Sequence, residues 1–194
     1  VHVRFGQARA LLAGDALQAL AFELLTPEDG VPPAMQARLC RLLAQAAGAD
    51  GMAGGQAIDL ASVGRSLSEH ELRHMHRLKT GALLQASVVM GAACGAPGPQ
   101  AEQALAQYGA ALGLAFQVVD DVLDVTQDSA TLGKTAGKDA ASDKPTYISL
   151  MGLAAAQAHA EELRGQAHAA LAASGLSDTR ALAALADTVV RRSH

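Results

Sequence analysis

The sequence contains few aromatic residues and few cysteines. Among its 194 residues there is no tryptophan, and aromatic side chains make up 3% of a chain that is 50% apolar. Cys40 and Cys94 have no neighbouring cysteine, so the spacing of a zinc site and of a disulfide framework is absent. A reducing, cytoplasmic setting fits this cysteine usage. Alanine and leucine dominate instead, which favours helices that pack closely on small side chains.

The sequence also lacks a strong excess of charge of either sign. Its net charge is -4, and it has no basic run that would suit a nucleic acid or an anionic lipid surface. The first residues lack the apolar core of a signal peptide, because charged side chains interrupt them. The uncharged stretch from Thr80 to Ala101 is long enough to cross a membrane, but its glycines, Pro97 and Pro99 favour a buried helix followed by a turn. We therefore expect no nucleic-acid partner and no membrane insertion.

Strand-like alternation and internal repeats are absent as well, whereas helical periodicity fills most of the chain. Ser68 and Glu71 have the spacing of a capping box at a helix start. The glycine-rich segment GADGMAGGQ, residues 48–56, allows close approach of a neighbouring element. We predict an all-α fold with helices over residues 7–25, 34–60, 72–93, 100–125 and 145–173, and a last helix that ends near residue 192.

The segment GLAFQVVDDVLDV, residues 113–125, carries three aspartates on an otherwise apolar helix. Four polar residues follow the spacing i, i+3, i+4 and i+7 and share one face: Gln117, Asp120, Asp121 and Asp124. Adjacent acids are usually just solvated, but the apolar flanks leave little of this helix for water, and no lysine relieves the repulsion. Carboxylates one turn apart can hold Mg²⁺, which takes one or two protein carboxylates together with substrate phosphate oxygens. The face therefore predicts a magnesium site.

Three lysines are candidates to meet a negatively charged group. One is predicted to face the core, and two follow the acidic helix in the sequence. Lys79 shares a face with Leu72, Met75 and Leu83, so it must either extend its ammonium to water or meet an anion. The residues alone leave both alternatives open. After the acidic helix, Lys134 and Lys138 each follow a glycine, which suits contact with a polyphosphate.

Residues 70–74 match the pattern H-E-x-x-H of zinc peptidases. Glu71 is already the expected capping partner of Ser68, and the pattern occupies a first helical turn rich in positive charge. No third zinc ligand accompanies His70 and His74. We interpret the pattern as a solvated helix start and expect no zinc.

Several motifs together resemble a known family. GLAFQVVDDVLDV, followed by TLGKTAGKD and DKPTY, is similar to the second aspartate-rich motif and the following loop of trans-isoprenyl diphosphate synthases. VHVRFG, LLAGDAL, GGQAIDL and KTGALL resemble the same family and occur in its order, and the match is closest to the bacterial farnesyl diphosphate synthase group. The resemblance implies an antiparallel bundle of helices around a deep central cavity, incomplete here at the N-terminus, and usually a homodimer.

The resemblance also implies a role for each charged residue. Asp120 and Asp124 would bind Mg²⁺ that bridges to an allylic diphosphate, and Asp121 would support this metal cluster. Lys79 and Lys134 would contact the same diphosphate.

The remaining roles concern the reacting carbon atoms. Thr80, Gln117 and the backbone carbonyl of Lys79 would face the allylic cation, and Phe116 would shape the site for isopentenyl diphosphate. The implied activity is a magnesium-dependent prenyltransferase that condenses dimethylallyl or geranyl diphosphate with isopentenyl diphosphate, giving a short-chain product such as farnesyl diphosphate.

The sequence departs from the family at its beginning. The first aspartate-rich motif and the arginine pair after it would precede VHVRFG, and both are missing. Residues 1–194 are then either the C-terminal portion of one synthase domain or a non-catalytic partner subunit. The start without methionine and the intact second motif favour truncation, with a chain that is inactive alone. A purely structural helical bundle would leave the aspartates and Lys79 unexplained.

Overall fold

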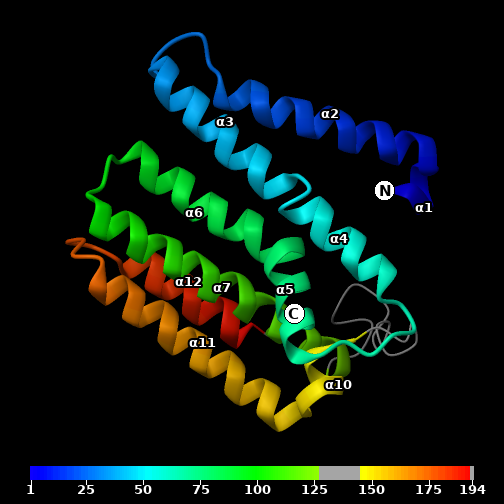
Figure 1. The fold of residues 1–194 in the computed structure, drawn as a ribbon. Coiled ribbons are helices and arrows are strands. Elements are labelled where there is room, and N and C mark those ends of the chain that lie inside the picture. The colour runs from blue at the N-terminus through cyan, green and yellow to red at the C-terminus, as the bar shows by residue number, and fades with distance from the viewer. Residues whose placement is uncertain (127–144, 193–194) are drawn as a thin grey trace. The chain divides into compact units, whose positions relative to one another are not determined.

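The computed structural model describes residues 1–126 and 145–192. Every regular element in these two ranges is a helix, which confirms the all-α prediction (Figure 1). The chain divides into two compact units, Val1–Ala44 and Gln45–His194, and each is described by itself. No helix in the described ranges is long and apolar enough to cross a membrane.

The first unit consists of two short connections and three helical segments. They are α1 (His2–Phe5), α2 (Gln7–Leu25) and most of α3 (Pro33–Ala47). The bounds of α2 are those predicted from the sequence. Gln36 closes the turn between α2 and α3, because its side-chain amide donates to the carbonyls of Pro27 at 2.8 Å and Val31 at 2.9 Å.

The second unit begins where the predicted helix over residues 34–60 is interrupted. The chain leaves α3 after Ala47 and starts α4 (Met52–Ala61) after a turn at Gly51. A side chain at Gly51 would lie 2.2 Å from the carbonyl oxygen of Ala46, so only glycine fits this turn. The prediction of one continuous helix was therefore wrong.

The next helical run is also divided, into α5 (Glu69–His76), the π-helical turn η1 (Arg77–Gly81) and α6 (Ala82–Cys94). The predicted capping box starts α5: Ser68 N–H donates to Glu71 Oε2 at 2.8 Å, and Glu71 N–H donates to Ser68 Oγ at 3.3 Å. The π turn inserts extra backbone into the helix, a distortion that often occurs at functional sites.

The longest helix, α7 (Pro99–Thr126), is central to the second unit. Figure 1 shows α6 beside α7 on one side, and α11 (Leu153–Ala173) and α12 (Arg180–Arg191) on the other. The short α10 (Tyr147–Met151) is separated from α11 by Gly152, whose φ of 82° favours glycine. The largest fully buried side chains of the core are Leu72, Met75, Tyr108, Val118 and Tyr147.

Candidate functional site

Lys79 meets an anion supplied by its own chain. Its ammonium nitrogen lies 2.8 Å from Oδ2 of Asp59 on α4. Asp59 is 3% exposed, whereas the side chain of Lys79 is 30% exposed. The ion pair decides between the two alternatives that the sequence left open for Lys79. Asp59 was not among the predicted site residues, although it is the only acid in the apolar segment GGQAIDL.

Two glycines let neighbouring helices approach the π turn that carries Lys79. A Cβ atom at Gly55 of α4 would lie 2.1 Å from the backbone nitrogen of Lys79. A Cβ atom at Gly113 of α7 would lie 2.8 Å from the Cα atom of Gly81. Backbones can come this close only where side chains are absent, so η1 is held tightly between α4 and α7. The predicted close approach at the glycine-rich segment is confirmed.

A chain of hydrogen bonds connects η1 to the acidic face of α7. Thr80 Oγ1 donates to Gln117 Oε1 at 3.1 Å, and Gln117 Nε2 donates to Asp121 Oδ1 at 2.9 Å. The other oxygen of Asp121 accepts the backbone N–H of Tyr147 at 2.8 Å. Asp121 is 2% exposed, so its carboxylate links η1, α7 and the start of α10 inside the protein. Burial raises the pKa of Tyr147 to about 12, and the charge of Arg73 opposes this effect.

Asp120 faces a different partner at the end of α12. Its Oδ1 lies 3.7 Å from Nη2 of Arg192, and its side chain is 36% exposed. The Arg192 guanidinium lies 3.9 Å above the Phe116 ring and donates to the Phe116 carbonyl oxygen at 3.0 Å. Burial lowers the pKa of Arg192, and the charge of Asp120 opposes this effect. Sequence periodicity gave no signal for Arg192, because the contact joins residues far apart in the chain.

The three aspartates of α7 therefore have different surroundings. Asp121 and Asp124 are buried, whereas Asp120 is partly exposed beside Arg192. Within residues 1–126 and 145–192, no group of three or more histidine, cysteine or acidic side chains is arranged to hold a metal ion. The assignment of these aspartates to magnesium stays a prediction.

Two further sequence predictions concern the lysines after α7 and the H-E-x-x-H pattern of α5. Lys134 and Lys138 lie outside the described residues. In the H-E-x-x-H pattern, Glu71 is held by the capping box and Nδ1 of His74 lies 3.1 Å from Nη2 of Arg77.

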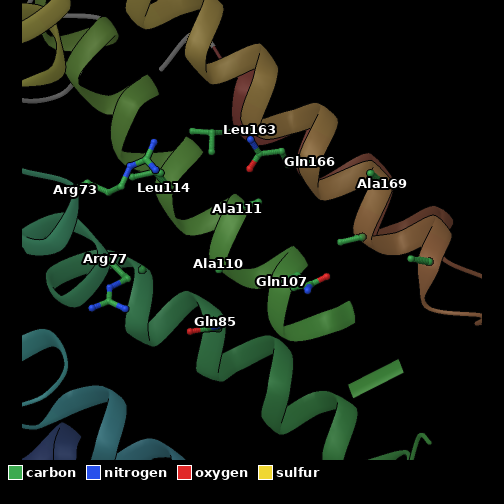
Figure 2. Close-up of a pocket in the computed structure, with 13 residues that line it drawn as sticks. Arg73, Arg77, Gln85, Gln107, Ala110, Ala111, Leu114, Leu163, Gln166 and Ala169 are labelled. Atoms are coloured by element: carbon green, nitrogen blue, oxygen red, sulfur yellow. The ribbon is translucent and has the colours of Figure 1, made fainter. Parts of the chain in front are cut away.

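A pocket of about 680 Å³ opens between α5, η1, α6, α7 and α11. Figure 2 shows Arg73 near one end, glutamines from three helices, and alanines and leucines along α7 and α11. Gly81 and Leu114 belong to its lining, but Lys79, Thr80, Gln117 and Asp120 do not. The pocket is therefore separate from the candidate site residues.

The sequence model of the polyprenyl synthetase family matches residues 1–179, which is most of the chain. The chain belongs to the polyprenyl synthetase family. Among similar members, a protein named probable farnesyl diphosphate synthase in Sinorhizobium fredii is 52% identical over 90% of this chain. The farnesyl diphosphate synthase of Escherichia coli is 45% identical over 99% of this chain.

A solved structure is similar to this chain in fold. It is the geranyltransferase of Helicobacter pylori complexed with magnesium and isoprenyl diphosphate, with a TM-score of 0.85 and 31% identity. The alignment covers 98% of this chain and 62% of that one. The chain also spans only 54% of the Sinorhizobium relative and 66% of the E. coli enzyme. It thus has the fold of the family over part of the length of these members.

Proposed function

We propose that this member of the polyprenyl synthetase family is part of a prenyltransferase that condenses an allylic diphosphate with isopentenyl diphosphate, forming farnesyl diphosphate. The contact between Thr80 and Gln117 carries the proposal, because it brings the K-T-G turn against the acidic face of α7. The Lys79 ammonium, which would bind a diphosphate, then belongs to the same site as the oxygen atoms of Thr80 and Gln117, which would face an allylic cation. The similarity to the E. coli farnesyl diphosphate synthase supports the choice of substrates.

The first step is ionisation of the allylic substrate. The bond between its first carbon and the diphosphate oxygen breaks, and the electron pair leaves with the diphosphate. The ammonium of Lys79 stabilises the charge that develops on this leaving group. The Thr80 hydroxyl, the Gln117 amide and the Lys79 carbonyl face the cationic carbon chain.

The second step forms the new carbon–carbon bond. The double bond of isopentenyl diphosphate attacks the allylic cation, and the released diphosphate takes the proton that is then lost. Phe116 packs beside the second substrate. The apolar side chains of α7 exclude water, which would otherwise react with the cation.

Asp120 and Asp124 are the residues that would hold Mg²⁺, since their oxygens are one helical turn apart on α7. When bound, the ion supplies positive charge against the diphosphate oxygens. An ion held by two carboxylates would complete its shell with substrate phosphate oxygens. Asp121 already accepts two hydrogen bonds, which suits a supporting role.

We further propose that the protein works as a homodimer. Five leucines of α2 are exposed: Leu11, Leu12, Leu17, Leu20 and Leu24. So much apolar surface on one helix is typical of an interaction face. Sedimentation equilibrium of the complete gene product should give twice the protomer mass, and a monomer at micromolar concentration would contradict this assembly.

Incorporation of radiolabelled isopentenyl diphosphate by the complete gene product tests the activity. We expect Mg²⁺-dependent condensation with geranyl diphosphate to farnesyl diphosphate. The alternative, a non-catalytic partner subunit, rests on the missing first aspartate-rich motif. The coding sequence upstream of Val1 distinguishes the two. An in-frame D-D-x-x-D followed by R-R supports the synthase, whereas an inactive complete product without it supports the partner subunit.

A further inference from the structure

We propose that Asp59 and Gly55 of α4 form a seat that positions Lys79 toward the leaving diphosphate, with Asp59 acting as a positioning residue. The inference rests on the proposed function. Gly55 and Asp59 are four positions apart in the sequence and therefore lie on the same face of α4. Gly55 lies against the backbone of Lys79, and Asp59 pairs with its ammonium.

The backbone part of the seat fixes where the lysine side chain begins. The missing side chain at Gly55 leaves room for the backbone of Lys79, where an added Cβ would lie 2.5 Å from its Cα atom. On α7, an added Cβ at Gly113 would lie 2.8 Å from the Cα atom of Gly81. The π turn between them cannot shift toward either helix without a backbone clash, so the root of the Lys79 side chain has one position.

The side-chain part of the seat fixes where the ammonium ends. A lysine side chain has four rotatable bonds and loses much rotamer freedom when it is held. Asp59 holds the ammonium at 2.8 Å from a buried oxygen. An ammonium has three donors, so the bond to Asp59 leaves two for phosphate oxygens. Because 30% of the Lys79 side chain is exposed, an anion can reach those donors.

The seat also lies next to the residues assigned to the allylic cation. Thr80 follows Lys79 directly, and its hydroxyl is held by Gln117. If Lys79 moved, the neighbouring hydroxyl and the Lys79 carbonyl would move with it. Asp59 and Gly55 therefore act on the reaction through Lys79, without contacting the substrate.

A double-mutant cycle in the complete gene product tests this role. Asp59→Asn keeps the size of the side chain and removes its charge, and we expect kcat per folded protein to fall about tenfold to a hundredfold. The KM for isopentenyl diphosphate should stay unchanged. In a Lys79→Ala background, Asp59→Asn should cause no further loss. Asp50→Asn, in an exposed position just before α4, is the matched control.

A second measurement does not depend on activity. Acylation of lysines by acetic anhydride, followed by mass spectrometry of peptides, reports how firmly each ammonium is held. Lys79 should react faster in Asp59→Asn than in the wild type or in Asp50→Asn. Inorganic pyrophosphate with Mg²⁺ should protect Lys79 in the wild type and protect it less in Asp59→Asn.

Two glycine variants test the backbone part of the seat. Gly55→Ala should lower kcat, because its Cβ displaces the backbone of Lys79. Gly91→Ala on α6, where a Cβ meets nothing within 4 Å, should behave as the wild type.

The outcomes separate the seat from the proposed function. If the wild type is active, three results would each overturn the seat alone. They are an unchanged acylation rate at Lys79 in Asp59→Asn, a wild-type kcat in Asp59→Asn, and a full additional loss from Asp59→Asn in the Lys79→Ala background. A wild type that does not condense isopentenyl diphosphate would overturn the proposed function first.

Discussion

Asp120 and Asp121 are neighbours in the sequence, yet their carboxylates are in different environments. Asp121 is buried and accepts hydrogen bonds from the Gln117 amide and the Tyr147 backbone. Asp120 is partly exposed and pairs loosely with Arg192, at 3.7 Å. A buried group that holds three elements together contributes mainly to folding, and we expect the more exposed Asp120 carboxylate to contribute less to it.

Substitution of each aspartate by alanine should therefore have different effects. Asp121→Ala leaves the Tyr147 N–H and the Gln117 amide without this acceptor, and we expect a loss of about 2 to 3 kcal/mol in unfolding free energy. Asp120→Ala should leave the melting temperature near the wild-type value and cut turnover severely. Urea unfolding and isopentenyl diphosphate incorporation across a Mg²⁺ titration measure both. Near-normal rates in Asp120→Ala would contradict the metal assignment.

Lys79→Met should reduce stability as well as activity. The substitution leaves the buried Asp59 carboxylate without the ammonium that lies 2.8 Å away. Loss of one partner from such a pair, which is partly open to solvent here, should lower the unfolding free energy by about 2 to 3 kcal/mol. The double variant Asp59→Leu, Lys79→Met should recover part of this loss. Equal stability of Lys79→Met and the wild type, measured by urea unfolding, would show that the pair contributes nothing.

At the residue scale, the spacing of residues along the sequence predicted contacts within a single helix but not contacts between helices. The capping box of Ser68 and Glu71 could be predicted, because it depends on residues within one helical turn. For Lys79 the sequence predicted only a choice between water and an anion, which the ion pair with Asp59 decides. Asp59 and Arg192 could not be predicted as partners. Their contacts depend on how α4 and α12 pack, which no periodicity in one segment contains.

At the element scale, the helices themselves were predicted better than their interruptions. The apolar periodicity over residues 100–125 corresponds closely to α7, and α2 has the predicted bounds. The π turn at Arg77–Gly81 and the break at Gly152 were missed. Such irregularities follow from close packing against neighbouring helices and from single backbone angles, and neither changes the hydrophobic pattern.

The contact between α11 and α12 should depend on pH through Asp187. Hydrogen bonds from His168 and Arg164, each 2.9 Å from the same oxygen, lower the pKa of Asp187. A lowered folded-state pKa means that this contribution to stability is present above the unfolded pKa and is lost as the pH falls through the folded pKa.

The unfolding free energy of the wild type should therefore fall more steeply below about pH 4 than that of Asp187→Asn. At pH 6 the wild type should be the more stable of the two. Urea unfolding of both proteins between pH 6 and pH 3 measures the difference, in which the titrating groups that do not contact Asp187 cancel. Parallel curves would show that the Asp187 cluster does not hold α12 against α11.

At the scale of the whole molecule, the chain spans 54% to 66% of its bacterial relatives. The first aspartate-rich motif expected for the family is not in the sequence. A diphosphate held by Lys79 and the α7 aspartates would then be contacted from one side only. Charge stabilisation in the transition state needs preorganised groups around the leaving group, so a missing side should affect turnover more than binding.

The last prediction concerns residues 1–194 alone, compared with the complete gene product. An incomplete cavity admits water to the allylic cation, and its exposed lining leaves apolar surface free to aggregate. We expect the isolated chain to be poorly soluble, to bind Mg²⁺ and diphosphate weakly, and not to condense isopentenyl diphosphate with geranyl diphosphate. The complete product should be soluble, bind Mg²⁺ and diphosphate, and condense the two substrates. Solubility after centrifugation, calorimetric titration with Mg²⁺ and pyrophosphate, and radiolabel incorporation measure them side by side. Clear product from the isolated chain would show that Lys79 and the α7 aspartates suffice, and that a second carboxylate cluster is not needed for the reaction.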